Sequence, residues 1–407
     1  MPESSRVDVL AGTPRSVLKY YVYKATKAVE FYRPIMYLFL LAQDLSFTQI
    51  AILEATYNVT TVVGEIPTGY VGDRVGRRNS LLIGTVVIAG TLVGIGLSNT
   101  FPAFLALYVV WSMGYNFRSG SEDAWLYDTL TDDITEDAFA AVRGRGESAS
   151  LAVGAVAAVL GGYLGSVDLS YPWFVAAAVT AVGALVLLTM DEPDTYEDAD
   201  TDVLGLRRIV GIVRDALAQR NVRALVVYYY VLYAAVTYLV FVFLQPVFET
   251  VVVDLGVDQS LVESLLGWFY AAYSLVGAGL SYYTGWIRDV VGMRTWFVAL
   301  PFVVGGALVG MAFVPLLALP TFLVARGLAD VTRSFAAQYV NDRIDTVGRA
   351  TVLSAMAMVS GLTVVPFQLG SGVISDVVSP LIALAVAGGV LVVGSALVLA
   401  WEVPIAE

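Results

Sequence analysis

Apolar residues in this chain gather in long runs, and a membrane-spanning helix needs about 20 mainly apolar residues. Six runs of this kind carry no charge: residues 80–98, 148–166, 171–190, 224–247, 295–315 and 379–401. Six more hold a few polar residues: 22–42, 47–70, 102–124, 261–287, 316–338 and 350–374. The pattern therefore predicts an all-α polytopic membrane protein with twelve transmembrane helices.

The cationic residues test this count, because Lys and Arg accumulate on the cytoplasmic side of membrane proteins. With the N-terminus inside, the predicted outer connections (43–46, 99–101, 167–170, 248–260 and 375–378) hold no Lys or Arg. The inner connections hold Arg74, Arg77, Arg78, Arg143, Arg145, Arg207, Arg208, Arg214, Arg220, Arg223, Arg288, Arg294, Arg343 and Arg349. We expect a multi-pass protein of the cell membrane with both termini in the cytoplasm.

The longest connection, residues 191–222, lies in the middle of the chain and opens with the acidic stretch DEPDTYEDADTD. Apolar residues then recur at helical spacing with arginines between them, which predicts an amphipathic helix on the inner membrane surface. Three parts follow: a six-helix bundle at 1–190, a cytoplasmic linker at 191–222, and a second six-helix bundle at 223–407.

Two loops of this chain repeat one pattern. Gly69 and Gly285, Asp73 and Asp289, Gly76 and Gly292, and Arg78 and Arg294 are each 216 positions apart. The two loops join the second to the third predicted helix and the eighth to the ninth. This agreement indicates a duplication, and two similar halves around a central site are typical of secondary transporters.

The first loop, Gly69-Tyr-Val-Gly-Asp73-Arg74-Val-Gly76-Arg77-Arg78, resembles the signature loop of the major facilitator superfamily. The wider stretch from Glu65 to Arg78, with Arg33-Pro34-Ile35 and the segment 119–128, resembles the drug-efflux-like permeases of that family. The resemblance implies twelve helices in two halves around a central cavity. It also implies a cytoplasmic latch in which Asp73 meets the start of the eleventh helix and Arg77 meets Asp128. The residues expected in this gating loop are Gly69, Asp73, Arg74, Gly76, Arg77, Arg78, Asp128, Gly285, Asp289, Gly292 and Arg294.

Ionisable residues also occur within the predicted helices, where burial in lipid costs several kcal/mol unless the group faces a cavity or a partner. At about 1.5 Å of rise per residue, Glu30 and Arg118 fall at similar depths, so they can pair. We expect Glu30, Arg118, Glu54 and Arg33 to form one proton-coupling network; the alternative is a static ion pair. Arg118 resembles the Arg of a helix-four family motif associated with proton coupling. Other candidates for the coupling site or the substrate cavity are Asn58, Tyr233, Tyr273, Arg326, Asp330 and Gln368.

Two further features are a pair of lysines near the end of the first helix and a pair of tyrosines at mid-depth. Lys24 and Lys27 come near the inner end of the first helix, where we expect them to extend toward water. Tyr233 and Tyr273 fall at mid-depth, where an interfacial belt does not explain them. An aromatic wall facing a carboxylate suits a lipophilic or cationic substrate through cation–π attraction; packing between helices is the other explanation.

The amino-acid composition excludes several kinds of functional site. The 407 residues are 58% hydrophobic and 14% charged, with no Cys and no His. Disulfides, thiolate nucleophiles, Cys/His metal sites and a His proton relay are therefore excluded. We expect no metal and no cofactor. The net charge of −12, with Lys19, Lys24 and Lys27 as the only lysines, favours a halophilic source.

The sequence predicts a secondary active transporter, not an enzyme, which exports amphipathic or cationic small molecules in exchange for protons. An ion-coupled importer of a metabolite is the alternative, because the fold does not decide direction. A membrane-embedded enzyme or a channel fits less well. The expected partners are a small-molecule substrate, H⁺ or Na⁺ as coupling ion, and the lipid bilayer. No nucleic acid partner is expected, and we expect a monomer.

Overall fold

A computed structural model of the chain describes residues 15–27, 31–130, 136–192, 211, 214, 220–342 and 349–402. Over these residues the chain is helical, with no strand. The first group of helices comprises α1 (Arg15–Thr26), η2 (Arg33–Ile35), α2 (Met36–Ala42), α3 (Phe47–Val75), α4 (Arg77–Leu97), α5 (Phe101–Ser119), α6 (Ser121–Leu130), α7 (Glu136–Gly165) and α8 (Tyr171–Leu188).

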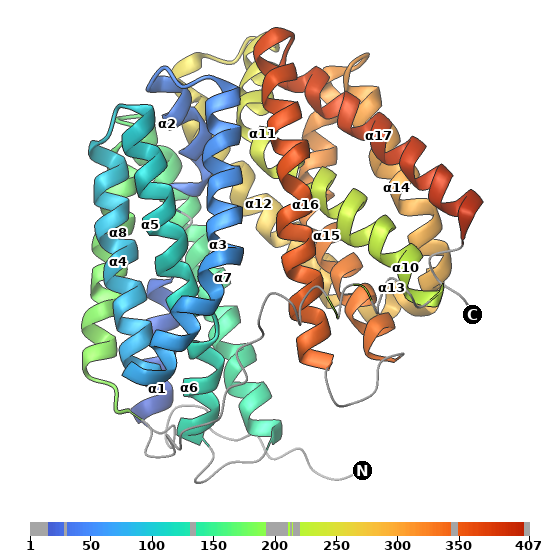
Figure 1. The fold of residues 1–407 in the computed structure, drawn as a ribbon. Coiled ribbons are helices and arrows are strands. Elements are labelled where there is room, and N and C mark those ends of the chain that lie inside the picture. Colours follow the sequence, from blue (N-terminus) through green and yellow to red (C-terminus); the bar gives the residue numbers. More distant parts are fainter. Residues whose placement is uncertain are drawn as a thin grey trace, which may run out of the picture.

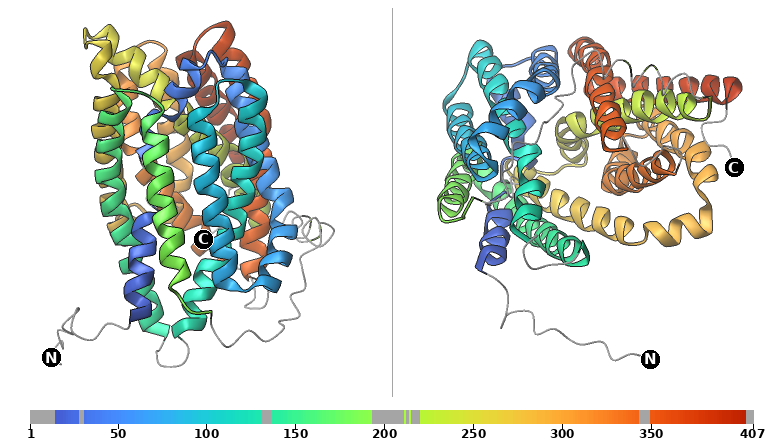
Figure 2. Two further views of the ribbon diagram at one scale, coloured as in Figure 1. Left: turned by 90° about the vertical axis from the view of Figure 1, so that its left-hand side faces the viewer. Right: turned by 60° about the horizontal axis from the view of Figure 1, so that its bottom comes forward.

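The second group comprises α10 (Arg220–Leu225), η3 (Val226–Tyr233), α11 (Ala234–Asp254), η4 (Gln259–Leu261), α12 (Val262–Tyr282), α13 (Thr284–Val291), α14 (Met293–Met311), η5 (Pro315–Leu317), α15 (Ala318–Asn341), α16 (Arg349–Val377) and α17 (Pro380–Trp401). Figure 1 shows the first group on the left and the second on the right, and the view from below in Figure 2 separates them again. The groups meet where α3 packs on α16 and α7 packs on α12. We call the top of Figure 1 the α2 end and the bottom the α6 end.

Nine helices of the described residues are long and apolar enough to cross a membrane. They account for nine of the twelve predicted runs, so the chain is a multi-pass membrane protein. The other three runs fall on α1 to α2, on α3 and on α5. Helix α3 is 29 residues long but carries Glu54, Glu65, Asp73 and Arg74. The count of twelve spans therefore stays a prediction.

The prediction of one helix over residues 22–42 was wrong. Helix α1 ends at Thr26, and a short 3₁₀ turn from Arg33 to Ile35 precedes α2. Pro34 lies in this turn, where its missing N–H and its fixed φ interrupt a helix. The apolar pattern alone did not show this break. Glu30 and the amphipathic stretch 203–210 lie outside the described residues.

The two repeated loops share one backbone conformation. Gly76 and Gly292 each end a helix at positive φ, +94° and +78°, which glycine adopts without strain. The amide of Gly76 donates to Gly72 O at 3.1 Å, and that of Gly292 donates to Arg288 O at 2.9 Å. Each glycine carbonyl then accepts from the residue four positions on, Ser80 or Trp296. The sequence repeat therefore corresponds to a repeated turn.

Candidate functional site

A cavity of about 200 Å³ lies at the junction of the two groups, and we call it the aromatic cavity. Helices α3 and α5 and the η2–α2 segment supply most of its wall, and α11 of the second group supplies the rest. Its lining residues are Tyr32, Arg33, Met36, Glu54, Tyr57, Tyr108, Trp111, Tyr115, Tyr238 and Phe241. The lining of this cavity is thus largely aromatic, with one carboxylate and one guanidinium.

Glu54 is the carboxylate of this cavity. It lies on α3 and is only 5% exposed. Its Oε1 accepts a hydrogen bond from the Tyr37 hydroxyl at 3.2 Å, and its Oε2 accepts one from the Tyr238 hydroxyl. Because Tyr238 lies on α11, this second bond joins the two groups of helices. Hydroxyl donors of this kind are what a buried carboxylate requires.

The rings around Glu54 hold one another in place. Trp111 packs edge-on against Tyr57 and Tyr108, with ring centres 5.7 and 5.4 Å apart. The Arg33 guanidinium lies 5.6 Å from the Phe241 ring centre, so rings of both groups contact the charged residues. Such edge-to-face pairs favour a defined geometry. The wall of the cavity is therefore a set of rings in mutual contact.

The side chain of Gln245, on α11, replaces a backbone hydrogen bond that is missing at the break in the first helix. Its Oε1 accepts from the Tyr37 amide at 2.7 Å, and its Nε2 donates to the Arg33 carbonyl at 2.6 Å. In an unbroken α-helix that amide and that carbonyl would bond to each other. Inserting a side chain between such a pair is a known cause of helix distortion. A side chain of the second group therefore completes the hydrogen bonding of the first.

Asp376 joins the groups in a similar way at the α2 end. It lies near the end of α16, and its two carboxylate oxygens accept from the amides of Phe47 and Thr48 at 2.7 and 3.0 Å. These amides open α3, where a helix leaves its first N–H groups unpaired and favours negative charge. Ser46 and Gln49 form a capping box at the same terminus.

A second cavity, of about 340 Å³, is formed by α1, α3, α5, α6 and α7 of the first group, and we call it the charged cavity. Its lining residues are Lys24, Lys27, Thr61, Tyr115, Asn116, Arg118, Ser119, Glu122, Asp123, Arg143 and Glu147. Tyr115 also lines the aromatic cavity, so the two sites share a wall.

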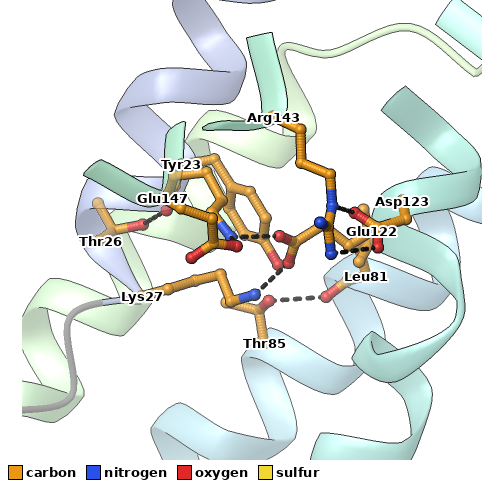
Figure 3. A network of polar contacts seen from close by, with 10 residues as sticks. Tyr23, Thr26, Lys27, Leu81, Thr85, Glu122, Asp123, Arg143 and Glu147 are labelled. Carbon is orange, nitrogen blue, oxygen red and sulfur yellow. Dashed lines mark hydrogen bonds and ion pairs between the residues drawn. The ribbon is translucent and has the colours of Figure 1, made fainter. Parts of the chain in front are cut away.

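Ion pairs join several residues that line the charged cavity, and Figure 3 shows this network. Lys24 Nζ lies 2.7 Å from Glu122 Oε1 and also contacts Glu147, while Lys27 bonds to the other oxygen of Glu122. Arg143 holds Asp123 through two bonds of 2.8 and 2.9 Å. The expectation that Lys24 extends toward water was wrong: its residue is 3% exposed, because two carboxylates from other helices surround its ammonium.

The four members of the expected coupling network do not share one cavity. Glu54 and Arg33 line the aromatic cavity, whereas Arg118 lines the charged cavity beside Tyr23 and Tyr115. Glu30 lies outside the described residues. The pairing of Glu30 with Arg118 stays a prediction.

Three candidates of the second group gather on α12 and α15. The Arg326 guanidinium lies 3.9 Å from Asp330 and 5.7 Å from the Tyr273 ring centre. Tyr233 is 2% exposed and stacks on Tyr229, 6.0 Å away between ring centres. Neither Tyr233 nor Tyr273 lines the two cavities described above. Their use by a substrate stays a prediction.

Two amide side chains complete the set of candidates. Both polar side-chain atoms of Gln368, on α16, are buried without a hydrogen-bond partner among the described residues. The same holds for Nδ2 of Asn58, on α3. Such groups are costly to bury, so each is a candidate for a ligand or for water.

The loop expected to gate transport is only partly described. Arg77 Nε lies 3.8 Å from Asp128 Oδ2, as the resemblance implies. Burial raises the pKa of the Asp128 carboxyl, and the Arg77 guanidinium offsets only part of this. Arg78 donates from Nε to the Met190 carbonyl at 3.1 Å, which ties the loop to the end of α8. The side chain of Asp73 lies outside the described residues, so its contact with the eleventh helix stays a prediction.

The remaining loop residues have simpler surroundings. The Arg74 guanidinium packs 4.1 Å from the Tyr70 ring centre. In the second copy, Asp289 meets the neighbouring Arg288 at 3.4 Å, and Arg294 lies in the first turn of α14. A Cβ on Gly69 or Gly285 would meet nothing within 4 Å, so close helix packing is not the reason for these two glycines.

Sequence reasoning missed the roles of four side chains that the structure brings to the sites. Gln245 is the only amide side chain of α11 and precedes Pro246, a signal that was available. Asp376 followed a predicted span and had no local signal for its role. Glu122 and Glu147 come from helices far apart in sequence, and only the fold shows that they share Lys24.

Known proteins resemble this chain in sequence and in fold. Residues 28–363 match the sequence profile of the Major Facilitator Superfamily. The "Uncharacterized MFS-type transporter YxaM" of Bacillus subtilis (strain 168) is 20% identical over 152 residues. That match spans 37% of this chain and 37% of the relative's length.

Solved structures resemble nearly the whole chain. The nucleoside transporter NupG superposes with a TM-score of 0.79 and 14% identity, over 95% of this chain and 99% of that one. An inward-facing, occupied bacterial homologue of the human lysosomal transporter Spinster gives 0.70 and 15%, over 96% and 97%. The D-xylose-proton symporter gives 0.61 and 12%, over 92% and 95%. At these identities the likeness shows the fold.

Proposed function

Since this chain belongs to the major facilitator superfamily, we propose that it is a secondary active transporter that moves a small amphipathic or cationic molecule by alternating access. The proposed architecture has twelve helices in two six-helix halves, 1–190 and 223–407, joined by a cytoplasmic linker. Both termini lie in the cytoplasm. The proposed direction is export, with protons as the coupling ion.

The observation that carries this proposal is the position of Glu54. Its carboxylate is buried at the junction of the two groups and bonds to Tyr238 across that junction. A movement of one group past the other would break this bond and change the surroundings of the carboxylate. Since burial and hydrogen bonding shift proton affinity in opposite directions, such a movement couples protonation to conformation.

The walls of the aromatic cavity support the substrate class. Tyrosine and tryptophan rings attract cations through their faces, and Glu54 supplies the single negative charge. A cavity of about 200 Å³ suits a small ligand or part of a larger one. One structural neighbour is named as a proton symporter, so proton coupling has a precedent on this fold.

The contacts of Gln245 and Asp376 support one state of the transport cycle. Both join the groups at the α2 end, which corresponds to the outer face if the termini are cytoplasmic. We infer that the structure represents a state closed to the outside. Opening to the outside then requires these bonds to part.

The test is transport in proteoliposomes under an imposed pH gradient or an imposed Na⁺ gradient, with a panel of dyes, drugs, nucleosides and sugars. We expect Glu54→Gln to abolish gradient-driven transport while substrate exchange without a gradient persists. Gln keeps the hydrogen-bond acceptor but cannot ionise.

Glu249→Gln is the matched control, because Glu249 lies on α11 at the α2 end and bonds only to Gln259 among the interactions described. It is expected to transport as the wild type does. Undiminished proton-driven transport by Glu54→Gln would refute the role of Glu54, and Glu30→Gln would then be the next variant to compare.

A further inference from the structure

Among the described residues, the charged cavity carries one positive charge more than its carboxylates balance. Four cationic side chains and three carboxylates line it. Arg143 and Asp123 form a two-bond pair that is complete in itself. Lys24 and Lys27 share Glu122, and Lys24 also contacts Glu147. The cation left over is Arg118.

Arg118 is buried, and two tyrosine rings lie beside its guanidinium. The residue is 4% exposed, and its guanidinium carbon lies 5.9 Å from the Tyr23 ring centre and 5.7 Å from that of Tyr115. Its Nε has no hydrogen-bond partner among the described residues. No described carboxylate lies within 4.0 Å of it, whereas the other three cations of the cavity each have one. A buried charge without a partner is strongly unfavourable, so a ligand that supplies the missing anion would be stabilised.

We propose that the charged cavity is a second ligand site, which binds the carboxylate group of a small organic acid on Arg118. A guanidinium presents parallel N–H donors that match the two oxygens of a carboxylate. The Lys27 ammonium, 5.9 Å from the same Tyr23 ring, supplies further positive charge. The volume of about 340 Å³ accommodates a small organic molecule.

The tyrosine rings beside Arg118 favour an organic acid over an inorganic anion. The two tyrosine rings beside Arg118 fix the orientation of the guanidinium and provide an apolar surface for a carbon skeleton. Tyr115 also lines the aromatic cavity, so a ligand here would lie beside the proposed transport site. This site does not depend on the coupling role of Glu54.

The experiment uses the full chain purified in detergent. Benzoate is titrated at constant ionic strength while thermal unfolding and calorimetric binding are recorded, and chloride and acetate are titrated in parallel. We expect a saturable rise in Tm with benzoate, because a ligand that binds only the folded state stabilises it. Acetate should bind more weakly than benzoate, and chloride should give no saturable rise.

Arg118→Gln is expected to weaken benzoate binding about tenfold or more, the size of effect when one charge-assisted bond to a carboxylate is lost. Arg223→Gln is the control outside both cavities: it removes a cation that has its own carboxylate, Glu402 at 2.6 Å, and it should bind benzoate as the wild type does. Arg118→Lys keeps the charge without the two-donor geometry and should fall between, and it serves in place of Arg118→Gln if that variant does not fold.

Equal benzoate affinity in the wild type and in the Arg118 variants would overturn the proposal. A saturable response to chloride that benzoate does not exceed would also overturn it, in favour of an inorganic anion site. Glu54→Gln should retain benzoate binding, so failure of the proposed transport mechanism and failure of this site are distinguishable.

Discussion

The two ends of the molecule hold their polar residues in different ways. At the α2 end, Gln245 and Asp376 of the second group bond to backbone atoms of the first. At the α6 end, the ion pairs of Lys24, Lys27 and Arg143 join helices of the first group alone.

This difference between the two ends indicates which contacts have to change during alternating access. Side-chain bonds to backbone amides are individually worth about 1 kcal/mol, so two such attachments can form and part in each cycle. The buried ion pair of Lys24 and Glu122 is costly to separate, because each lone charge would then be left uncompensated. The charged cavity is therefore expected to move as one unit with the first group, while the α2 end opens and closes.

The largest expected effect on the stability of the whole fold comes from the tight packing between the groups at α7 and α12. A Cβ on Gly267 would lie 2.7 Å from the Ala158 carbonyl oxygen and 3.1 Å from Gly162 Cα. Gly267→Ala should therefore destabilise the protein by about 1–3 kcal/mol, the usual cost of overpacking. Thermal unfolding in detergent, followed by tryptophan fluorescence, measures this.

The control for that variant is Gly279→Ala on the same helix, where a Cβ would meet nothing within 4 Å. This change should leave stability unaltered or raise it by about 0.5–1 kcal/mol, since Ala is the better helix former. Equal stability of the two variants would contradict the tight contact at Gly267.

An intermediate effect is expected from Gln245→Leu, which leaves the Tyr37 amide and the Arg33 carbonyl without their partner. A buried backbone group that loses its hydrogen bond costs about 1–3 kcal/mol, so the state closed at the α2 end should become less populated. The chain has no cysteine. Met36→Cys, in the aromatic cavity, therefore gives a single labelling site for an impermeant thiol reagent applied from outside.

We expect Gln245→Leu to increase the labelling rate of that cysteine. Gln49→Leu is the matched control, because Gln49 caps Ser46 within the first group and does not join the groups. Labelling that is unchanged by Gln245→Leu, or equally raised by Gln49→Leu, would show that Gln245 does not hold the α2 end closed.

The smallest effect is expected from Asp376→Asn. The amide oxygen can still accept one bond from Phe47 or Thr48, but the charge at the α3 terminus is lost, which is worth about 0.3–1 kcal/mol. Labelling at Met36→Cys should rise slightly. The control is Asp168→Asn, which changes a carboxylate that accepts from Ser170 within the first group and should leave the labelling rate unaltered. If Asp168→Asn raised labelling more than Asp376→Asn does, labelling would depend on negative charge at the α2 end and not on the contact of Asp376 with α3.

Much of the fold could be predicted from the sequence, because helix formation in a membrane depends on local apolar content. The boundaries of α4, α8 and α17 lie within a few residues of the predicted runs 80–98, 171–190 and 379–401. The loop repeat could also be predicted, because the turn at Gly76 and Gly292 requires a residue that tolerates positive φ. The family resemblance carried by the first of these loops agrees with the match over residues 28–363.

The break in the first helix had a local signal in Pro34, but the residue that makes the break tolerable in a buried position is distant in the sequence. The Tyr37 amide and the Arg33 carbonyl remain satisfied only because Gln245, 208 and 212 positions away, bonds to both. The error on Lys24 has a similar origin. Depth along one assumed helix placed its ammonium near water, whereas Glu122, 98 positions away, lies beside it in the fold.

The sequence by itself thus determined the membrane class, the family and the identity of the unusual polar residues, since each of these depends on which residues are present and on their spacing. The tertiary structure alone decided which of those residues meet. It joined Glu54 to Tyr238 across 184 positions and divided the expected charge network between two cavities. The physical reason is that a buried charge is stabilised by whatever partner packing brings within hydrogen-bond distance, and helix packing in a membrane is not encoded in the local pattern of any one helix.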